Sequence, residues 1–232
     1  MIITGAFRTI WQGLDWSYLT NILTYIIPAL ICIPFHETCH GLVAYKLGDP
    51  TAKRAGRLTL NPLRHIDWMG LVMMVVFHFG WAKPVPVNPG YFKNPKRGMA
   101  ITALAGPVSN LVLAVVFLIL YGFFFYPLYF AGGVGEFVMD LLLTTAYLST
   151  ALAIFNLIPI SPLDGSKVLY SVLSDEAYFK IMRYERYGML LMILLVATGA
   201  LGAPLSKVTG TVFDQLFNIA VWADEVGGLL WR

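Results

Sequence analysis

Charged residues are scarce in this chain of 232 residues. Asp, Glu, Lys and Arg make up 12% of it, whereas hydrophobic residues make up 58%. A typical soluble domain is about 25% charged. The shortage of charge therefore favours an integral membrane protein, and the length suits either one domain or a bundle of several membrane helices.

Cysteine is nearly absent as well. The two cysteines, Cys32 and Cys39, are seven residues apart, which on a helix is about 10 Å along the axis and too far for a disulfide bond. Cys39 could act as a soft metal ligand, although a small packing residue is the simpler interpretation. No disulfide bond is expected.

The chain also lacks a dense basic cluster, and no removable signal peptide is expected. Lys and Arg are interspersed with Pro, Gly and aromatic residues, so a nucleic acid is not expected as a partner. The N-terminal residues show no basic region followed by a small-residue cleavage site. The first apolar stretch is therefore expected to act as an uncleaved signal.

Four stretches have no charged residue at all, and each is at least as long as the roughly 20 residues that a membrane-spanning helix requires. They cover residues 16–35, 98–135, 141–163 and 187–206. We therefore predict an all-α polytopic membrane protein, a bundle of about four to six transmembrane helices. The expected spans, within a single domain over 1–232, are 18–46, 98–126, 137–158 and 187–205.

The tail at 208–222 is ambiguous. Apolar residues recur there at helical spacing, but Asp214, Gln215 and Asn218 make a surface helix as reasonable as a further span. Whether the tail crosses the membrane is left open.

The placement of Lys and Arg orients the expected spans. Basic residues gather in 46–97 and in 164–186, whereas the connection at 126–136 contains none. The positive-inside rule places the two basic segments at the cytoplasmic face. We expect a multi-pass protein of the cell membrane.

The segment at 55–92 does not have the pattern of an ordinary span. R-L-T-L at 57–60 and W-A-K-P-V-P-V at 81–87 have the pattern of short extended segments bounded by Asn-Pro turns. Between them, 71–79 is apolar but too short to cross a bilayer. We predict a small re-entrant or β-strand insertion between the first and second long spans, in which two prolines suit an edge strand.

The first charge-free stretch leads directly into the pattern H-E-x-x-H, formed by His36, Glu37 and His40. Residues four apart share one face of a helix, so both imidazoles can reach one metal ion. Two neutral histidine nitrogens beside a carboxylate that accepts a proton are typical of zinc hydrolases. A pair of structural core histidines would leave Glu37 unexplained, and ionisable side chains at membrane depth usually mark function.

A catalytic zinc ion normally has three protein ligands and one open position. The extended pattern H-E-x-x-H-x-x-G-x-x-H is absent, so the third ligand must come from His65, His78, a scattered carboxylate or Asp164. Topology favours Asp164, because the first and third spans both run inward and end near the same face. Asp164 could instead be an ordinary turn residue, since Asp-Gly is a common turn dipeptide. His65 is expected at the membrane interface, and His78 could face the cleft.

Several motifs occur in an order that resembles the site-2 protease family of intramembrane zinc metalloproteases. H-E-x-x-H is followed by G-R-L-T-L-N-P-L-R-H-I-D at 56–67, W-A-K-P-V-P-V-N-P, A-G-P-x-x-N and finally N-x-x-P-x-x-P-L-D-G. The similarity extends from about residue 20 to residue 200. It resembles the compact branch found in bacteria and archaea, without the PDZ or CBS domains of larger members.

The resemblance implies one Zn²⁺ per chain, held by His36, His40 and Asp164. It implies that Glu37 is the general base and that Asn156 positions the substrate or stabilises the transition state. The implied activity is hydrolysis of peptide bonds in or near transmembrane segments of substrate membrane proteins, within the lipid bilayer and near its cytoplasmic face.

A substrate helix must unwind locally to present a peptide bond, and the extended segments at 57–60 and 81–87 could pair with it as an added strand. The alternative function is a membrane metal transporter, or a metal-binding membrane protein, that uses the same cluster. A homodimer is left open.

Overall fold

The structure is a computed structural model, and it describes residues 16–70 and 82–231. Every regular element in these residues is a helix. The long helices are α2 (Trp16–Lys46), α5 (Pro95–Phe123), α7 (Gly133–Asn156), α9 (Asp175–Ala197) and α10 (Gly202–Trp231). The short ones are α3 (Thr51–Arg54), α6 (Phe125–Phe130), α8 (Asp164–Ser171) and the 3₁₀ turns η1 (Pro62–Arg64) and η2 (Pro89–Tyr91).

Helices of membrane-spanning length and composition occur where the charge-free stretches predicted them. Among the described residues, three helices are long and apolar enough to cross a membrane by themselves: Ile22–Lys46 of α2, the whole of α5 and the whole of α7. They overlap the predicted spans at 18–46, 98–126 and 137–158. The prediction of an all-α polytopic membrane protein is confirmed.

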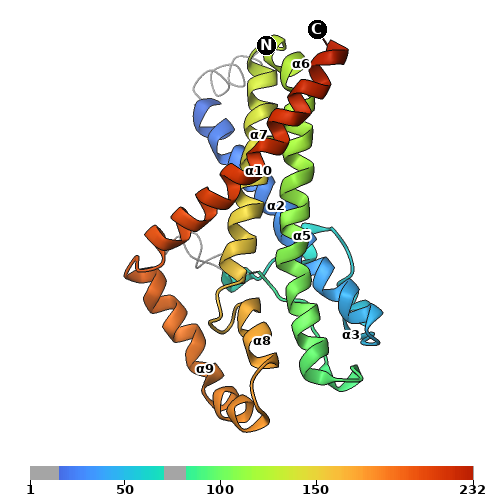
Figure 1. Cartoon of the computed structure of the whole chain (residues 1–232), viewed down its shortest axis with the longest axis vertical. Helices are drawn as coiled ribbons and strands as arrows, with labels where there is room; N and C mark the ends of the chain where they lie inside the picture. The colour runs from blue at the N-terminus through green and yellow to red at the C-terminus, as the bar shows by residue number, and fades with distance from the viewer. Residues whose placement is uncertain (1–15, 71–81, 232) are drawn as a thin grey trace, which may run out of the picture.

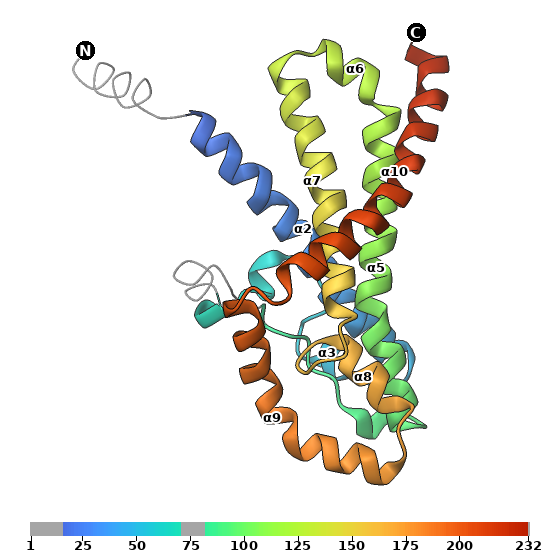
Figure 2. The ribbon, with the colours of Figure 1, turned by 60° about the vertical axis from the view of Figure 1, so that its left-hand side comes forward.

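The predicted fourth span at 187–205 is not one straight helix. α9 ends at Ala197, Gly199 adopts a left-handed conformation with φ of 69°, and α10 begins at Gly202. The two helices are bent by 86° at this break, and together they have the length and composition of one further span. The ambiguous tail at 208–222 is part of α10, which crosses α5 and α7 (Figure 2).

Helix α5 is central to the bundle, because it packs against α2, α7, α8 and α10 (Figure 1). The side-chain oxygen of Asn94 accepts a hydrogen bond from Arg97 N at 3.0 Å, and Pro95 occupies the first helical position. An Asn cap followed by proline is a strong helix start, since the cap satisfies a free backbone N–H and proline lacks one. The local sequence therefore determines where α5 begins.

Small residues let α10 approach α5 closely. A Cβ atom on Gly122 of α5 would lie 2.0 Å from the Ala220 carbonyl oxygen of α10. Beside this contact, Leu118, Ala146 and Ala220 form a buried core shared by α5, α7 and α10. Close backbone approach through small residues is the usual means by which membrane helices associate.

Residues 82–88, called the strap below, have no regular secondary structure and contact α2. The strap is attached through its backbone. Lys83 N donates to the His65 carbonyl oxygen at 2.9 Å, and the Arg57 guanidinium donates to the carbonyl oxygens of Lys83 and Pro84. These bonds hold the strap against the part of the chain that follows α2.

The β-strand prediction for the insertion at 55–92 is not met in the described residues, which contain no strand there. Pro84 and Pro86 have no N–H to contribute to a strand ladder, and Arg57 occupies the neighbouring carbonyls. The apolar stretch at 71–79, on which the re-entrant prediction depends, lies outside the described residues.

Candidate metal centre

Two helices bring together the side chains that the motifs singled out. His36 and His40 lie one turn apart on α2 and are buried, with 7% and 8% of each residue exposed. Their Nε2 atoms are 2.9 Å apart. Asp164, the first residue of α8, places its Oδ2 atom 3.1 Å from both nitrogens. The two ends of the chain segment 36–164 thus meet in one cluster.

The hydrogen positions at this cluster favour a cation. His40 Nδ1 lies 2.7 Å from the Thr102 carbonyl oxygen, which can only accept, so Nδ1 carries a hydrogen. In the neutral imidazole the Nε2 atom of His40 then presents a lone pair, and it faces a carboxylate oxygen at 3.1 Å. Converging acceptors of this kind repel one another unless a proton or a metal ion lies between them.

The distances fit zinc. With bonds of about 2.0–2.1 Å, the ligand atoms of a tetrahedral zinc ion lie roughly 3.3 Å from one another. The distances of 2.9–3.1 Å among His36 Nε2, His40 Nε2 and Asp164 Oδ2 are within a few tenths of an ångström of that value. Among the described residues, these three form the cluster of His, Cys, Asp and Glu side chains that could hold a metal ion.

Asp164 is ionised in this setting. Burial raises the pKa of its carboxyl, but when no metal ion is bound the imidazoles of His36 and His40 supply a shared proton, and their hydrogen bonds and charge outweigh burial and lower the pKa to about 2. The negative charge suits a divalent metal ion, because it neutralises part of the ion's charge in a mostly buried site.

Gly106 of α5 provides the space for both imidazoles. A Cβ atom at this position would lie 2.4 Å from His36 Cε1 and 2.4 Å from His40 Nε2. Any side chain here would displace the rings, so the close approach of α5 to α2 requires glycine.

Glu37 is held by the strap. Its Oε2 atom accepts a hydrogen bond from Val85 N at 2.8 Å. Because proline precedes and follows Val85, its N–H is the single backbone donor between Lys83 and Val87. The Val85 N–H group is therefore bonded to Glu37 and is not free to pair with an added strand.

The comparison with known proteins agrees with this geometry. A model of peptidase family M50 matches residues 134–198, which include Asn156 and Asp164 but not the H-E-x-x-H pattern. YwhC of Bacillus subtilis, a predicted zinc metalloprotease, is 37% identical over 193 residues, or 78% of this chain and 84% of the relative. The chain belongs to the site-2 protease family, peptidase family M50.

Other relatives of this site-2 protease extend across bacteria and archaea. Rip2 of Mycolicibacterium smegmatis, also a predicted zinc metalloprotease, is 29% identical over 93% of this chain and 82% of the relative. Zinc metalloprotease MJ0392 of Methanocaldococcus jannaschii is 28% identical over 87% of this chain and 48% of the relative. No solved structure gives a significant match. The chain is a membrane metalloendopeptidase, and its cofactor is Zn²⁺.

The other residues considered as site residues have different surroundings. The amide nitrogen of Asn156 donates to the Leu152 carbonyl oxygen of its own helix at 2.9 Å and not to the cluster. His65, expected at the membrane interface, is buried with 2% exposed and bonds through Nε2 to the Thr59 carbonyl oxygen. His78 lies outside the described residues. Cys39 is partly buried, free and outside the metal-binding cluster.

Sequence reasoning did not find the contacts that surround the cluster. Val85, Thr102 and Gly106 act through backbone atoms or through the absence of a side chain, so their residue types carry little signal. One signal was available, because A-G-P-x-x-N places Gly106 and Asn110 four residues apart on the face of α5 that approaches α2. The motif alone does not indicate which helix this face of α5 contacts.

Proposed function

We propose that this site-2 protease hydrolyses peptide bonds in or near transmembrane segments of other membrane proteins, at a zinc ion held by His36, His40 and Asp164. The observation that carries the proposal is that two histidines beside Glu37, on a helix with the length and composition of a membrane span, meet Asp164 of α8. Bound zinc polarises a carbonyl group and lowers the pKa of water.

The protein residues have separate roles in this proposal. Glu37 is the general base, and because Val85 N–H occupies Oε2, the second carboxylate oxygen, Oε1, takes the proton of the attacking water and later returns it to the leaving amine. The bond from Val85 fixes the carboxylate relative to the strap. Asn156 contacts the substrate after its side chain leaves the Leu152 carbonyl oxygen.

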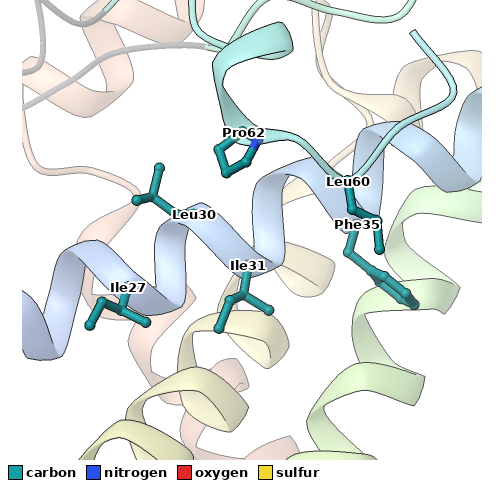
Figure 3. Close-up of a pocket in the computed structure, with 6 residues that line it drawn as sticks. All are labelled: Ile27, Leu30, Ile31, Phe35, Leu60 and Pro62. Carbon is teal, nitrogen blue, oxygen red and sulfur yellow. The ribbon is translucent and has the colours of Figure 1, made fainter.

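An apolar groove along α2 supports a membrane segment as the substrate. The groove encloses about 370 Å³ between α2 and the chain around the start of η1 (Figure 3). It is lined by Ile27, Leu30, Ile31, Phe35, Leu60 and Pro62. Phe35 directly precedes His36, and consecutive helical residues point about 100° apart, so apolar side chains of a bound transmembrane segment would lie on the face of α2 adjacent to the one that carries the histidines. A groove of this composition suits a lipid-soluble segment and not a hydrated peptide.

The proposed setting is the cell membrane, with the cluster near its cytoplasmic face. His40 is six residues before Lys46, the basic residue that ends α2, so the cluster lies about 9 Å of helix rise below the basic segment. The partners are the bilayer and transmembrane substrate proteins.

The test uses two variants of the purified full chain. Glu37→Gln should keep about one zinc ion per chain and lose about 10²–10⁴-fold in cleavage of fusion proteins that carry one transmembrane segment. Asp164→Ala should lose the zinc ion, measured by metal analysis, because two histidines alone are not a stable zinc site.

Matched controls separate these effects from general damage. Glu136→Gln changes an exposed acidic residue in the first turn of α7, and Asp214→Ala changes one within α10; both variants should retain zinc and cleavage. Zinc retained in Asp164→Ala would overturn the ligand set. Zinc binding and metal flux without any proteolysis would instead favour the transporter alternative.

A further inference from the structure

Asn110 is the buried polar side chain closest to the metal centre on α5. It is completely buried, and its Nδ2 atom lies 3.2 Å from Nδ1 of His36. Its other amide atom, Oδ1, is buried without a hydrogen-bond donor. An unsatisfied buried amide oxygen is costly, so this arrangement calls for a physical explanation.

The hydrogen positions on His36 supply that explanation. A neutral imidazole that binds a metal through Nε2 uses that lone pair for the metal and carries its hydrogen on Nδ1. A hydrogen on His36 Nδ1 cannot bond to an Nδ2 group, because both are donors. A half-turn of the amide about its Cβ–Cγ bond exchanges Oδ1 and Nδ2, two atoms of nearly equal size, and presents an acceptor to Nδ1.

We propose that Asn110 is a positioning residue for zinc: in the zinc-bound protein its Oδ1 atom accepts the hydrogen of His36 Nδ1. This bond fixes the tautomer and the ring orientation in which Nε2 faces the metal ion. The inference rests on the proposed ligand role of His36. It adds a residue that touches neither substrate nor zinc and acts through the imidazole alone.

In this proposal a single row of residues on α5 orients both zinc histidines. Thr102, Gly106 and Asn110 are spaced by four residues, so they share one face of the helix. Thr102 accepts from His40 Nδ1 through its carbonyl oxygen, Gly106 leaves space for both rings, and Asn110 contacts His36. α5 thus sets the tautomers of ligands that belong to α2.

A hydrogen bond from α7 holds the backbone of α5 at Asn110. Ser149 of α7 donates through Oγ to the backbone carbonyl oxygen of Asn110 at 2.9 Å. Ser149 and Asn110 are both completely buried. The peptide group of Asn110 is therefore held by a neighbouring helix, and this bond is unchanged when the two amide atoms of the side chain exchange places.

The experiment compares Asn110→Leu and Asn110→Asp with the unchanged full-length protein in detergent. Zinc dissociation constants are measured by competition with a chromophoric chelator. Leu has nearly the shape of Asn but accepts no hydrogen bond, so we expect it to weaken zinc binding by about 10–100-fold. A carboxylate can only accept, so Asn110→Asp should bind zinc within about threefold of the unchanged protein. The matched control is Asn218→Leu, an exposed asparagine of α10, which should leave zinc binding unchanged.

A second readout separates positioning from general stability. The increase in melting temperature that zinc produces should shrink in Asn110→Leu and persist in Asn110→Asp, whatever happens to the melting temperature of the zinc-free proteins. Zinc binding by the Leu variant at full affinity, or equal weakening in the Leu and Asp variants, overturns the proposal.

The unchanged protein provides a test that does not depend on folding of a variant. With ¹⁵N-labelled histidine, the zinc-bound protein should show a hydrogen on His36 Nδ1, and an Nδ1 without hydrogen overturns the proposal. If the unchanged protein binds no zinc that Asp164→Ala removes, the ligand assignment itself fails. If it does bind such zinc and Asn110→Leu has no effect, only the role of Asn110 fails.

Discussion

Gly106 shows how one missing side chain can determine whether a metal centre forms. Its position on α5 leaves less than 3 Å between a hypothetical Cβ and atoms of both imidazoles. Carbon atoms do not approach that closely in folded proteins, so a methyl group here must move either the rings or the helix. Moving the rings separates ligand atoms that zinc needs at fixed distances.

Gly106→Ala should therefore lower zinc occupancy well below one ion per chain, and cleavage should fall in proportion. The measurement is metal analysis of the purified variant, together with its melting temperature without zinc. Gly210→Ala is the matched control, because a Cβ on this glycine of α10 meets nothing within 4 Å. Full zinc occupancy in Gly106→Ala would show that the helices can separate without harming the site.

Asp49 is a second residue whose surroundings determine its chemistry. It is buried just after α2, where Oδ2 accepts from Asn88 N at 2.7 Å and Oδ1 accepts from Thr51 N at 2.9 Å. Burial raises the pKa of this carboxyl, but hydrogen bonds from Thr51 and Asn88 and the charge of Arg54 outweigh burial and lower the pKa. The ionised form therefore ties the end of α2 to the strap.

Because the pKa of Asp49 is lower in the folded protein, its ionised carboxylate stabilises the fold at pH values above the unfolded pKa of about 4. This stabilisation is lost as the pH falls. Asp49→Asn should cost about 1–3 kcal/mol of unfolding free energy at pH 7. The difference from the unchanged protein should narrow as the pH falls below about 4. Denaturant unfolding in detergent at several pH values measures both, and a difference that widens at low pH would contradict this role.

The strap is the element that connects the metal centre to the basic segment that follows α2. Arg57 holds its carbonyl groups, and Val85 N–H bonds to Glu37. Arg57 is buried, with 6% of the residue exposed, and its guanidinium group bonds to the carbonyl oxygens of Lys83 and Pro84. Because the same short segment binds Arg57 and Glu37, loss of the first contact should loosen the second.

Arg57→Met keeps the apolar length of the side chain and removes its donors. We expect the Val85 amide to exchange its hydrogen roughly tenfold faster or more, because one or two bonds from a charged group are lost. Hydrogen–deuterium exchange of the strap measures this. Arg64→Met is the control, since Arg64 is exposed and should leave the exchange unchanged. Unchanged protection in Arg57→Met would show that Glu37 alone holds the strap.

The molecule has two different ends along the length of α5. The strap, η2 and the start of α5 lie at one end, whereas α6, which follows α5, lies at the other (Figure 1). The strap end contains the basic segment, and the α6 end has no Lys or Arg between 126 and 136. This asymmetry is the basis for placing the strap end in the cytoplasm.

Single cysteines at the two ends test this orientation. In a chain without its two native cysteines, Ala131→Cys beside α6 should react with a membrane-impermeant maleimide on intact cells. Lys93→Cys beside η2 should react only after the membrane is opened. Both positions are exposed, so access through the membrane decides the outcome. Labelling of Lys93→Cys on intact cells would invert the proposed topology.

Much of the architecture was predictable because it depends on local or compositional properties. Charge-free length predicted the spans within α2, α5 and α7, and the four-residue spacing of His36 and His40 predicted that they share a helix face. The motif order and the inward direction of the third span also favoured Asp164. The break at 198–201 was missed, because the composition stays apolar on both sides of it.

By itself, the sequence determined the membrane class, the span positions and the residue types of a zinc site, since hydrophobic length and helical periodicity act over neighbouring residues. The tertiary structure decided which atoms surround that site. The packing of α5 on α2 brings Thr102, Gly106 and Asn110 to the histidines. Val85 reaches Glu37 only because the strap folds back against α2. These contacts join residues 48 to 74 positions apart, and no local pattern encodes such a separation.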